Sequence, residues 1–142
     1  MKKKYELSCN IAQTLNIIGD RWTLLILHEI FLGKKTYREL EERLTGIASN
    51  LLSSRLKELE KNGFIKSEPY QKAPVRYSYS ITKKGADLRE VFNAMILWGH
   101  KHLDVCYKKI VDKKTGDEIE LRYYNPKRDL VLDSDEIEVR DI

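Results

Sequence analysis

The stretch that decides the fold is GIASNLLSSRLKELEKNGFI, Gly46–Ile65. It opens as a turn, has the leucine spacing of a helix, and reaches Gly63, which suits the left-handed residue at which helices end. At about 100° per residue, Leu52, Leu56 and Leu59 share a narrow arc that would pack inward. The opposite side of this helix is small, polar and cationic, and it carries Asn50, Ser53, Ser54, Lys57 and Lys61.

That polar face, on a helix expected from about Ser49 to Asn62, has the chemistry of a DNA reader. Small side chains near the first turns let the backbone approach a groove, where asparagine pairs with adenine and serine donates or accepts. Lys57, further along, is placed to meet phosphates. The alternative is a hydrated surface with no partner, since every amphipathic surface helix has a polar face. The neighbouring segments must therefore decide.

The preceding segments predict a helix-turn-helix. A short helix should end near Gly19, and Asp20 can then cap a largely buried helix over Trp22–Leu32. Thr36 and Glu39 have the spacing of a capping box, and the short helix behind them stops before the turn at Gly46. Two helices separated by a tight, glycine-containing turn form the helix-turn-helix pattern.

The segments FIKSEPY and VRYSYSI, joined by QKAP, predict a β-hairpin directly behind this motif. Alternation of Tyr77 and Tyr79 with small or charged residues is strand-like. A hairpin in this position makes a winged helix, and basic residues at its tip suit the DNA backbone or minor groove. We expect the wing contacts to be made by Lys72 and Arg76.

A long helix over Thr82–Leu103 should follow, with an apolar face wide enough to hold a second subunit. The residues expected at that dimer contact are Leu88, Val91, Phe92, Met95 and Trp98. Beyond it, alternation around Lys113–Gly116 indicates a hairpin, and DLVLDSDEIEVRDI, Asp129–Ile142, could add one or two strands. We therefore expect a winged helix-turn-helix and dimerisation domain over 1–104 and a small β extension over 105–142. The fold class is mainly α with a β-hairpin wing (α+β), dimerised through terminal helices.

Composition favours a polyanion partner. The 142 residues carry a net charge of +4, and residues 1–102 hold 18 basic and 11 acidic side chains against 8 and 11 in residues 103–142. Two cysteines make no disulfide framework and fit a reducing cytosol. Neither a secretory signal nor an apolar run of membrane-spanning length is present, so we expect a cytoplasmic protein without a membrane partner.

These features occur together in one known family. Cys9 is followed by IGDRWTLLILHEI (Ile18–Ile30), YRELEERLTGIASNLLSSRLKELEKNGFI (Tyr37–Ile65), YQKAPVRYSYSITKKG (Tyr70–Gly85) and WGHKH (Trp98–His102). Over roughly residues 8–102 the sequence resembles the HxlR-type winged helix-turn-helix transcriptional regulators, which are relatives of the MarR group. The resemblance implies a homodimer that binds double-stranded DNA at a (pseudo)palindromic operator in a sequence-specific manner.

The resemblance also assigns residues. It places base recognition at Ser49, Asn50, Ser53 and Ser54 and wing contacts at Lys72 and Arg76. Two departures occur: Ala48 stands where the family usually has serine, which would let Ser49 cap the helix, and Val75 replaces the second proline of the wing. The alternative function is a winged-helix module that binds proteins and has lost specific DNA binding.

Cys9 stands where several members of the family carry a cysteine that senses oxidants or electrophiles. It lies at the expected start of the first helix with Lys2–Lys4 nearby, and both features can lower a thiol pKa. A structural cysteine without a signalling role is the competing interpretation. Similarly, Tyr70, Tyr77 and Tyr79 either line a small-molecule effector pocket or are ordinary half-buried strand residues.

Metal and catalytic chemistry are not expected. His102 and Cys106 are four residues apart, but no further ligand has suitable spacing. The seven glycines fit turns and helix ends rather than a phosphate-binding loop, and no nucleophile, base and orienting group come together. We therefore expect no cofactor and no enzyme activity.

Overall fold

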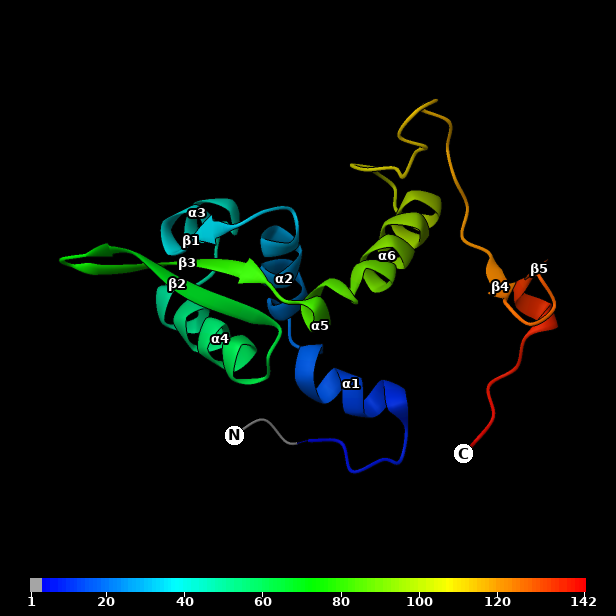
Figure 1. Ribbon diagram of the computed structural model, residues 1–142, viewed down its shortest axis with the longest axis horizontal. Helices are drawn as coiled ribbons and strands as arrows, with labels where there is room; N and C mark the ends of the chain where they lie inside the picture. Colours follow the sequence, from blue (N-terminus) through cyan, green and yellow to red (C-terminus); the bar gives the residue numbers. More distant parts are fainter. Residues whose placement is uncertain (1–3) are drawn as a thin grey trace. The chain divides into compact units, whose positions relative to one another are not determined.

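The helix-turn-helix is built around α2 (Thr23–Phe31), whose Ile26, Leu27 and Ile30 are almost fully buried. The computed structural model describes residues 4–142, which divide into two compact units, one ending at Arg89 and the other comprising Glu90–Ile142. Figure 1 shows the elements of both units, which are described separately below. Leu25 of α2 is 49% exposed, so the expected burial holds for one side of this helix only.

The helix α1 (Asn10–Ile18) ends at Gly19, as its sequence predicts. The carboxylate of Asp20 then accepts hydrogen bonds from the backbone N–H groups of Trp22 and Thr23, at 3.0 and 3.2 Å. These are two of the amide groups that the start of α2 leaves without helical partners. The predicted cap on α2 is therefore present.

The helix α3 (Tyr37–Arg43) carries the predicted capping box. Thr36 accepts from the N–H of Glu39, and the Glu39 carboxylate accepts from the N–H of Thr36 at 2.7 Å. Hydrogen bonds from the Thr36 backbone and hydroxyl lower the pKa of Glu39. The box fixes the residue at which α3 begins, directly after the short strand β1 (Lys35–Thr36).

The helix α4 (Ser49–Lys61) is buried along Leu52, Leu56 and Leu59, the three leucines expected to face inward. Its N-cap is Ala48, which makes no side-chain cap, so the expectation that Ser49 would cap the helix was wrong. Ser49 is instead the first helical residue, and its hydroxyl bonds elsewhere. Gly63 follows α4 with φ +76°, the conformation for which glycine is favoured.

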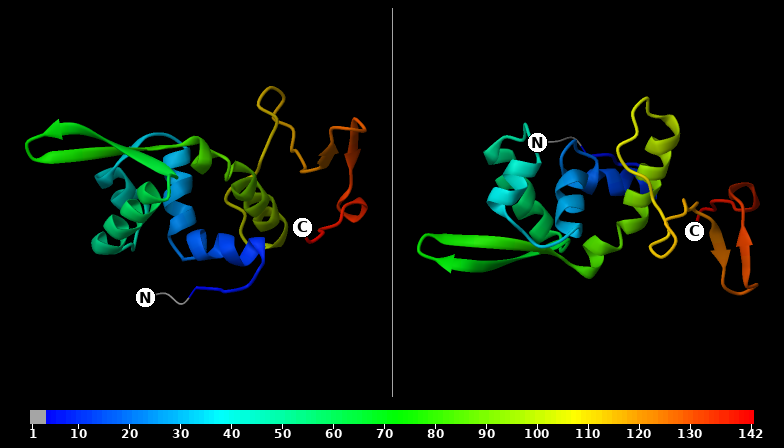
Figure 2. Two further views of the ribbon diagram at one scale, coloured as in Figure 1. Left: turned by 60° about the horizontal axis from the view of Figure 1, so that its bottom comes forward. Right: turned by 90° about the horizontal axis from the view of Figure 1, so that it is seen from above.

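The strands β2 (Ile65–Lys72) and β3 (Val75–Ile81) form the predicted hairpin. β1 adds to β3, giving an antiparallel sheet of order β1-β3-β2 that a two-residue strand could not reveal from sequence periodicity. The hairpin reaches well beyond α3 and α4 in each view (Figures 1 and 2). This is the geometry of a wing.

The single long helix expected over Thr82–Leu103 is interrupted. The structure has a short α5 (Lys83–Ala86), a turn at Asp87 and Leu88, and then α6 (Arg89–His102). Contacts with the body of the first unit hold α5: the Thr82 hydroxyl donates to the Gly63 carbonyl at 2.6 Å, and the Lys84 ammonium donates to the Asn62 carbonyl at 2.8 Å. These tertiary contacts set the direction of α5, so α6 begins as a separate element.

The second unit holds α6 and the C-terminal extension, residues 105–142. The expected hairpin around Lys113–Gly116 is reduced to a tight turn closed by one bridge between Val111 and Glu118. A short hairpin of β4 (Tyr123–Asn125) and β5 (Leu130–Leu132) follows, with a 3₁₀ turn over Ser134–Glu136. The extension thus contains a short hairpin, but its turn lies at residues 126–129 and not at Lys113–Gly116, where the alternation in the sequence predicts it.

Leu56→Ala should lower the free energy of unfolding of the first unit by about 2–5 kcal/mol, because it removes a side chain that is 2% exposed and leaves a cavity. The adjacent exposed substitution Lys57→Ala should change it by less than about 0.5 kcal/mol. Urea unfolding followed by circular dichroism measures both. Equal effects of the two substitutions would contradict the inward packing of α4.

Candidate nucleic-acid interface

The start of α4 is fastened to α3 by hydrogen bonds. The Tyr37 hydroxyl donates to the Ser49 carbonyl at 2.8 Å, and the Ser53 hydroxyl lies 3.4 Å from the same tyrosine oxygen. The Ser49 hydroxyl donates to the Glu41 carboxylate at 2.5 Å. Two of the expected recognition residues, Ser49 and Ser53, therefore also hold the two helices of the motif together.

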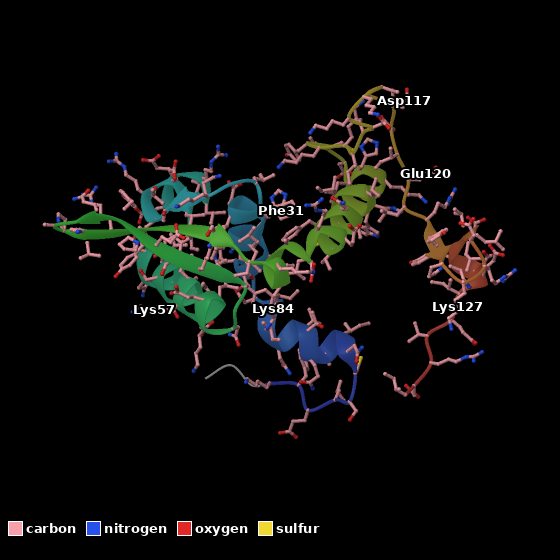
Figure 3. The ribbon with its side chains drawn as sticks, viewed as in Figure 1. Phe31, Lys57, Lys84, Asp117, Glu120 and Lys127 are labelled. Carbon is pink, nitrogen blue, oxygen red and sulfur yellow. The ribbon has the colours of Figure 1, made fainter. Side chains whose placement is uncertain are left out.

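A line of side chains along α4 faces away from the protein. Asn50, Ser54 and Lys57 are exposed and follow at the four- and three-residue spacing of one helix face, which Lys61 continues. The side-chain Oδ1 of Asn50 accepts from the backbone N–H of Leu51 at 2.9 Å, which orients the side-chain amide beside the helix N-terminus. We call Asn50, Ser54 and Lys57 the polar face of α4; Figure 3 labels Lys57 on it.

The charged residues of the wing form ion pairs near its base and, among the residues that the structure describes, have no such partners at its tip. Near its base, Lys34 and Lys66 lie 2.9 and 3.5 Å from the Glu68 carboxylate, and the hydrogen bond from Lys34 is the main cause of a lowered Glu68 pKa. At the tip, Lys72 and Arg76 are exposed and flank the turn. Neither of them, nor Lys57, forms an ion pair within residues 4–142. The cations at the wing tip and on α4 are thus uncompensated.

Arg55 holds α4 against the capped end of α2. Its guanidinium Nε lies 3.3 Å from the Asp20 carboxylate, and its Nη1 donates to Glu58 at 2.7 Å. The side chains of Arg55 and Asp20 are 16% and 10% exposed, so this pair is partly desolvated and interacts more strongly than a surface pair. Sequence reasoning missed Arg55, although on a helical wheel it borders the leucine arc of α4 and would have indicated partial burial.

Cys9 is exposed and occupies the N-cap position of α1. Residues 5–7 are held against α1 by hydrogen bonds. The Gln13 side chain donates to the Leu7 carbonyl at 2.8 Å, and the Asn16 side chain accepts from the N–H and donates to the carbonyl of Tyr5. Lys4 is exposed, whereas Lys2 and Lys3 lie outside the described residues. The thiol is therefore open to solvent at a helix N-terminus.

Of the five residues expected at a dimer contact, three are exposed in the structure and two are buried or half-buried. Val91, Met95 and Trp98 of α6 are 38%, 55% and 62% exposed, whereas Phe92 is buried and Leu88 half-buried within the chain. The Trp98 ring lies 4.9 Å from the His102 ring between centroids, and together with Val91 and Met95 it forms a contiguous exposed apolar patch, which is more informative than a single exposed residue. The exposed face of α6 is thus formed by Val91, Met95 and Trp98.

The other candidate groups show no assembled site. Tyr70 and Tyr77 are exposed, and Tyr79 is half-buried with a pKa raised by that burial. Within residues 4–142, no three histidine, cysteine or acidic side chains gather in an arrangement that could hold a metal ion. In the same part of the chain, no helix is both long and apolar enough to cross a membrane.

The sequence model of the protein family described as HxlR-like helix-turn-helix matches residues 17–107 of this chain, which include α2 to α6 and the wing. The chain belongs to the HxlR-like helix-turn-helix family. Its HxlR-like relative YdeP, an uncharacterised helix-turn-helix transcriptional regulator of Bacillus subtilis, is 34% identical over 78% of this chain and 87% of its own. The chain is accordingly a winged-helix transcriptional regulator of α+β fold.

Solved structures of similar proteins cover different lengths of this HxlR-like chain. The reduced form of the regulator YodB from Bacillus subtilis matches 69% of this chain and 97% of its own, with 31% identity and a TM-score of 0.58. YodB has also been solved with a bound quinone. PA1374 from Pseudomonas aeruginosa, described as a candidate transcription factor, matches 94% of this chain and 92% of its own, with 28% identity and a TM-score of 0.69.

Asp20→Ala should lower the free energy of unfolding by about 1–3 kcal/mol, because α2 loses its cap and the buried Arg55 guanidinium loses one of its two carboxylate partners. Asp87→Ala, which breaks only the exposed pair with Lys83, should cost less than about 1 kcal/mol. Thermal and urea unfolding of both variants test the difference. An Asp20 variant as stable as the natural protein would show that this contact does not anchor α4.

Proposed function

We propose that the protein acts as a homodimer that binds a pseudo-palindromic operator through the polar face of α4. The observation that carries this proposal is the exposed line of Asn50, Ser54 and Lys57 on a helix fastened to the body by Arg55 and Tyr37. Asn50 and Ser54 would meet base edges in the major groove, because their groups donate and accept there, and Lys57 would meet a phosphate. Ser49 and Ser53 would act mainly by setting the position of the helix start.

The wing would bind the same duplex outside the major groove. Lys72 and Arg76 are cations without carboxylate partners in the described part of the chain, carried on a hairpin that extends past the recognition helix. Such groups bind phosphates or the minor groove whatever the sequence. The wing thus contributes affinity, and the polar face of α4 contributes selectivity.

A second subunit would place two recognition helices on one operator. The exposed Val91, Met95 and Trp98 of α6 give an apolar face suited to pairing with another copy. Two half-sites about one helical turn apart, roughly 34 Å, would then be read by the two copies of α4. The two-fold symmetry of such a dimer is the reason that a palindromic operator is the expected target.

A thiol or small-molecule signal would modulate binding. Cys9 is exposed at the N-cap of α1, and the similar regulator YodB is known in a reduced and a quinone-bound form. The thiolate attacks a ring carbon of an electrophile such as a quinone and forms a carbon–sulfur bond. The electron pair of the ring double bond moves to a quinone oxygen, and the proton lost from that carbon and one proton from water end on the two oxygens, which gives a hydroquinone thioether. We propose Cys9 as the group that reacts.

The test of DNA binding is a gel-shift series with genomic fragments at two salt concentrations. A specific complex that persists with excess competitor and weakens steeply with salt is expected, because the bound lysines and arginines displace counterions. Binding of all fragments alike would contradict the proposed operator. Failure to bind any fragment at low salt would favour the protein-interaction alternative.

Asn50→Ala should reduce the preference for the operator over unrelated duplex by about 1–3 kcal/mol, because it removes a side chain proposed to pair with a base. Fluorescence anisotropy with both duplexes measures this ratio. Lys113→Ala, an exposed substitution in the acidic extension, is the matched control and should leave the ratio unchanged. An unchanged ratio for the Asn50 variant would remove its proposed role.

Arg76→Ala should weaken binding to operator and unrelated duplex by a similar factor, because the wing tip is proposed to contact phosphates. The slope of log affinity against log salt should fall by about one unit. Anisotropy titrations at four salt concentrations give this slope. A loss confined to the operator would instead mean that Arg76 reads bases.

Treatment with a quinone should add the ring to Cys9, and diamide should oxidise Cys9 to a disulfide with a second thiol; either reaction should lower operator affinity. Mass spectrometry of the digested protein should find the quinone adduct on Cys9 in the natural protein and in Cys106→Ser, and none at that position in Cys9→Ser. Operator binding by Cys9→Ser should become insensitive to the reagent. Equal sensitivity of the Cys9 variant would contradict a sensing role.

A further inference from the structure

The C-terminal extension has no core of its own. Every residue from 105 to 142 is exposed or half-buried, including apolar side chains such as Leu121, Tyr123 and Val131, which are 44%, 51% and 63% exposed. An isolated two-stranded hairpin is at best marginally stable in water. The β4–β5 hairpin therefore needs a further apolar surface against which to pack.

Within the second unit, the extension is fastened to the C-terminal end of α6. The Cys106 thiol donates to the His100 carbonyl at 3.0 Å, and the Glu118 carboxylate lies 3.8 Å from the His100 imidazole and 3.3 Å from the Lys109 ammonium. Figure 3 labels Asp117 and Glu120 on either side of Glu118 in the segment that leads to β4. These contacts join the extension to the helix proposed to pair the subunits.

The extension and α6 together line one apolar groove of about 740 Å³. The contribution of the extension consists of Leu121, in the segment just before β4, and Tyr123, the first residue of β4. The contribution of α6 and its end consists of Glu90, Val91, Ala94, Met95, Trp98, Gly99 and Leu103. Glu90 is the one charged residue among the groove's lining.

We propose that this groove receives α6 of a second copy of the chain, with Leu121 and Tyr123 forming a side wall of the dimer contact. The inference rests on the homodimer proposed above and extends it, since residues 108–142 lie outside the family match at residues 17–107. In a two-fold dimer each copy supplies both a groove and an inserted helix, so the same apolar residues form the contact on both subunits. Trp98, the largest exposed side chain of the set, would be the central anchor of the contact.

The exposed residues around the groove supply much of the surface that a subunit interface needs. With the roughly 150–250 Å² of an aromatic side chain taken as an upper guide, the exposed fractions of Val91, Met95, Trp98, Leu103, Leu121 and Tyr123 amount to about 600 Å² per chain, of which only a part lines the groove itself. A standard interface buries about 800 Å² per partner, of which a little over half is apolar. Without Leu121 and Tyr123 about one third of this surface is lost.

Charge excludes DNA as the occupant of this groove. Residues 90–142 hold 9 basic and 12 acidic side chains, a net charge of −3, which repels a phosphate backbone. A match to PA1374 over 94% of this chain, against 69% for YodB, shows that a fold including most of the extension occurs in another protein. Exposed apolar side chains of a coreless extension beside the exposed apolar face of α6 fit a dimer contact.

The test compares two double variants of the full-length chain by sedimentation velocity over a concentration series. Leu121→Ser with Tyr123→Ser should raise the dimer dissociation constant about tenfold or more. The matched control is Tyr124→Ser with Val131→Ser, which removes two somewhat more exposed apolar side chains that pair with each other on the face of the hairpin opposite Tyr123. The control should shift the constant less than about twofold, even though Tyr124 also loses its hydrogen bond to Asp129.

A third variant, Met95→Ser with Trp98→Ser, separates this inference from the proposed function. If it dissociates the dimer while Leu121→Ser with Tyr123→Ser leaves the constant unchanged, the homodimer stands and the role of the extension is refuted. If the natural protein is monomeric at every concentration, both proposals fail. Equal weakening by the groove and control variants would also refute the groove, because it would mean that only the stability of the hairpin matters.

Discussion

The carboxylate of Asp20 is the point on which the position of the recognition helix depends. It caps α2 through two backbone amides and faces the Arg55 guanidinium at 3.3 Å, in a setting where both side chains are nearly buried. The Asp20 carboxylate thus binds both the first amides of α2 and the Arg55 side chain in the middle of α4. Because Leu52, Leu56 and Leu59 pack on the same side as Arg55, the opposite face of α4 is turned outward as a consequence.

The distribution of charge follows from this scaffold. Cations that support the fold are paired, as Lys34 is with Glu68 and Arg55 is with Asp20 and Glu58. Cations proposed to meet DNA have no carboxylate partner in the described part of the chain, and they lie on the exposed face of α4 and at the wing tip. Unpaired cations that remain solvated lose little on binding a phosphate and release counterions when they do. The fold therefore needs no rearrangement of its internal ion pairs in order to bind.

Much of this fold could be predicted from the sequence, because the helix caps and the spacing of apolar residues act between residues that are close along the chain. The Thr36 and Glu39 capping box, the leucine spacing of α4 and the glycine at position 63 each act within one or two turns. The features that were missed depend on tertiary contacts. The break after α5 comes from its attachment to the Gly63 and Asn62 carbonyls, and the Ser49 hydroxyl is drawn to Glu41 rather than to a cap. For the same reason the exposed residues of α4 could be named from the sequence but Arg55 could not, because its role depends on Asp20 in the turn between α1 and α2.

Methylation interference on an operator fragment selected from a random pool tests the central claim most directly, since it reports which groove the polar face of α4 enters. Methyl groups on guanine N7 project into the major groove, and those on adenine N3 project into the minor groove. We expect two patches of major-groove interference centred about 10 base pairs apart, each flanked by minor-groove interference from the wing. Interference confined to the minor groove, or a single unpaired patch, would contradict it.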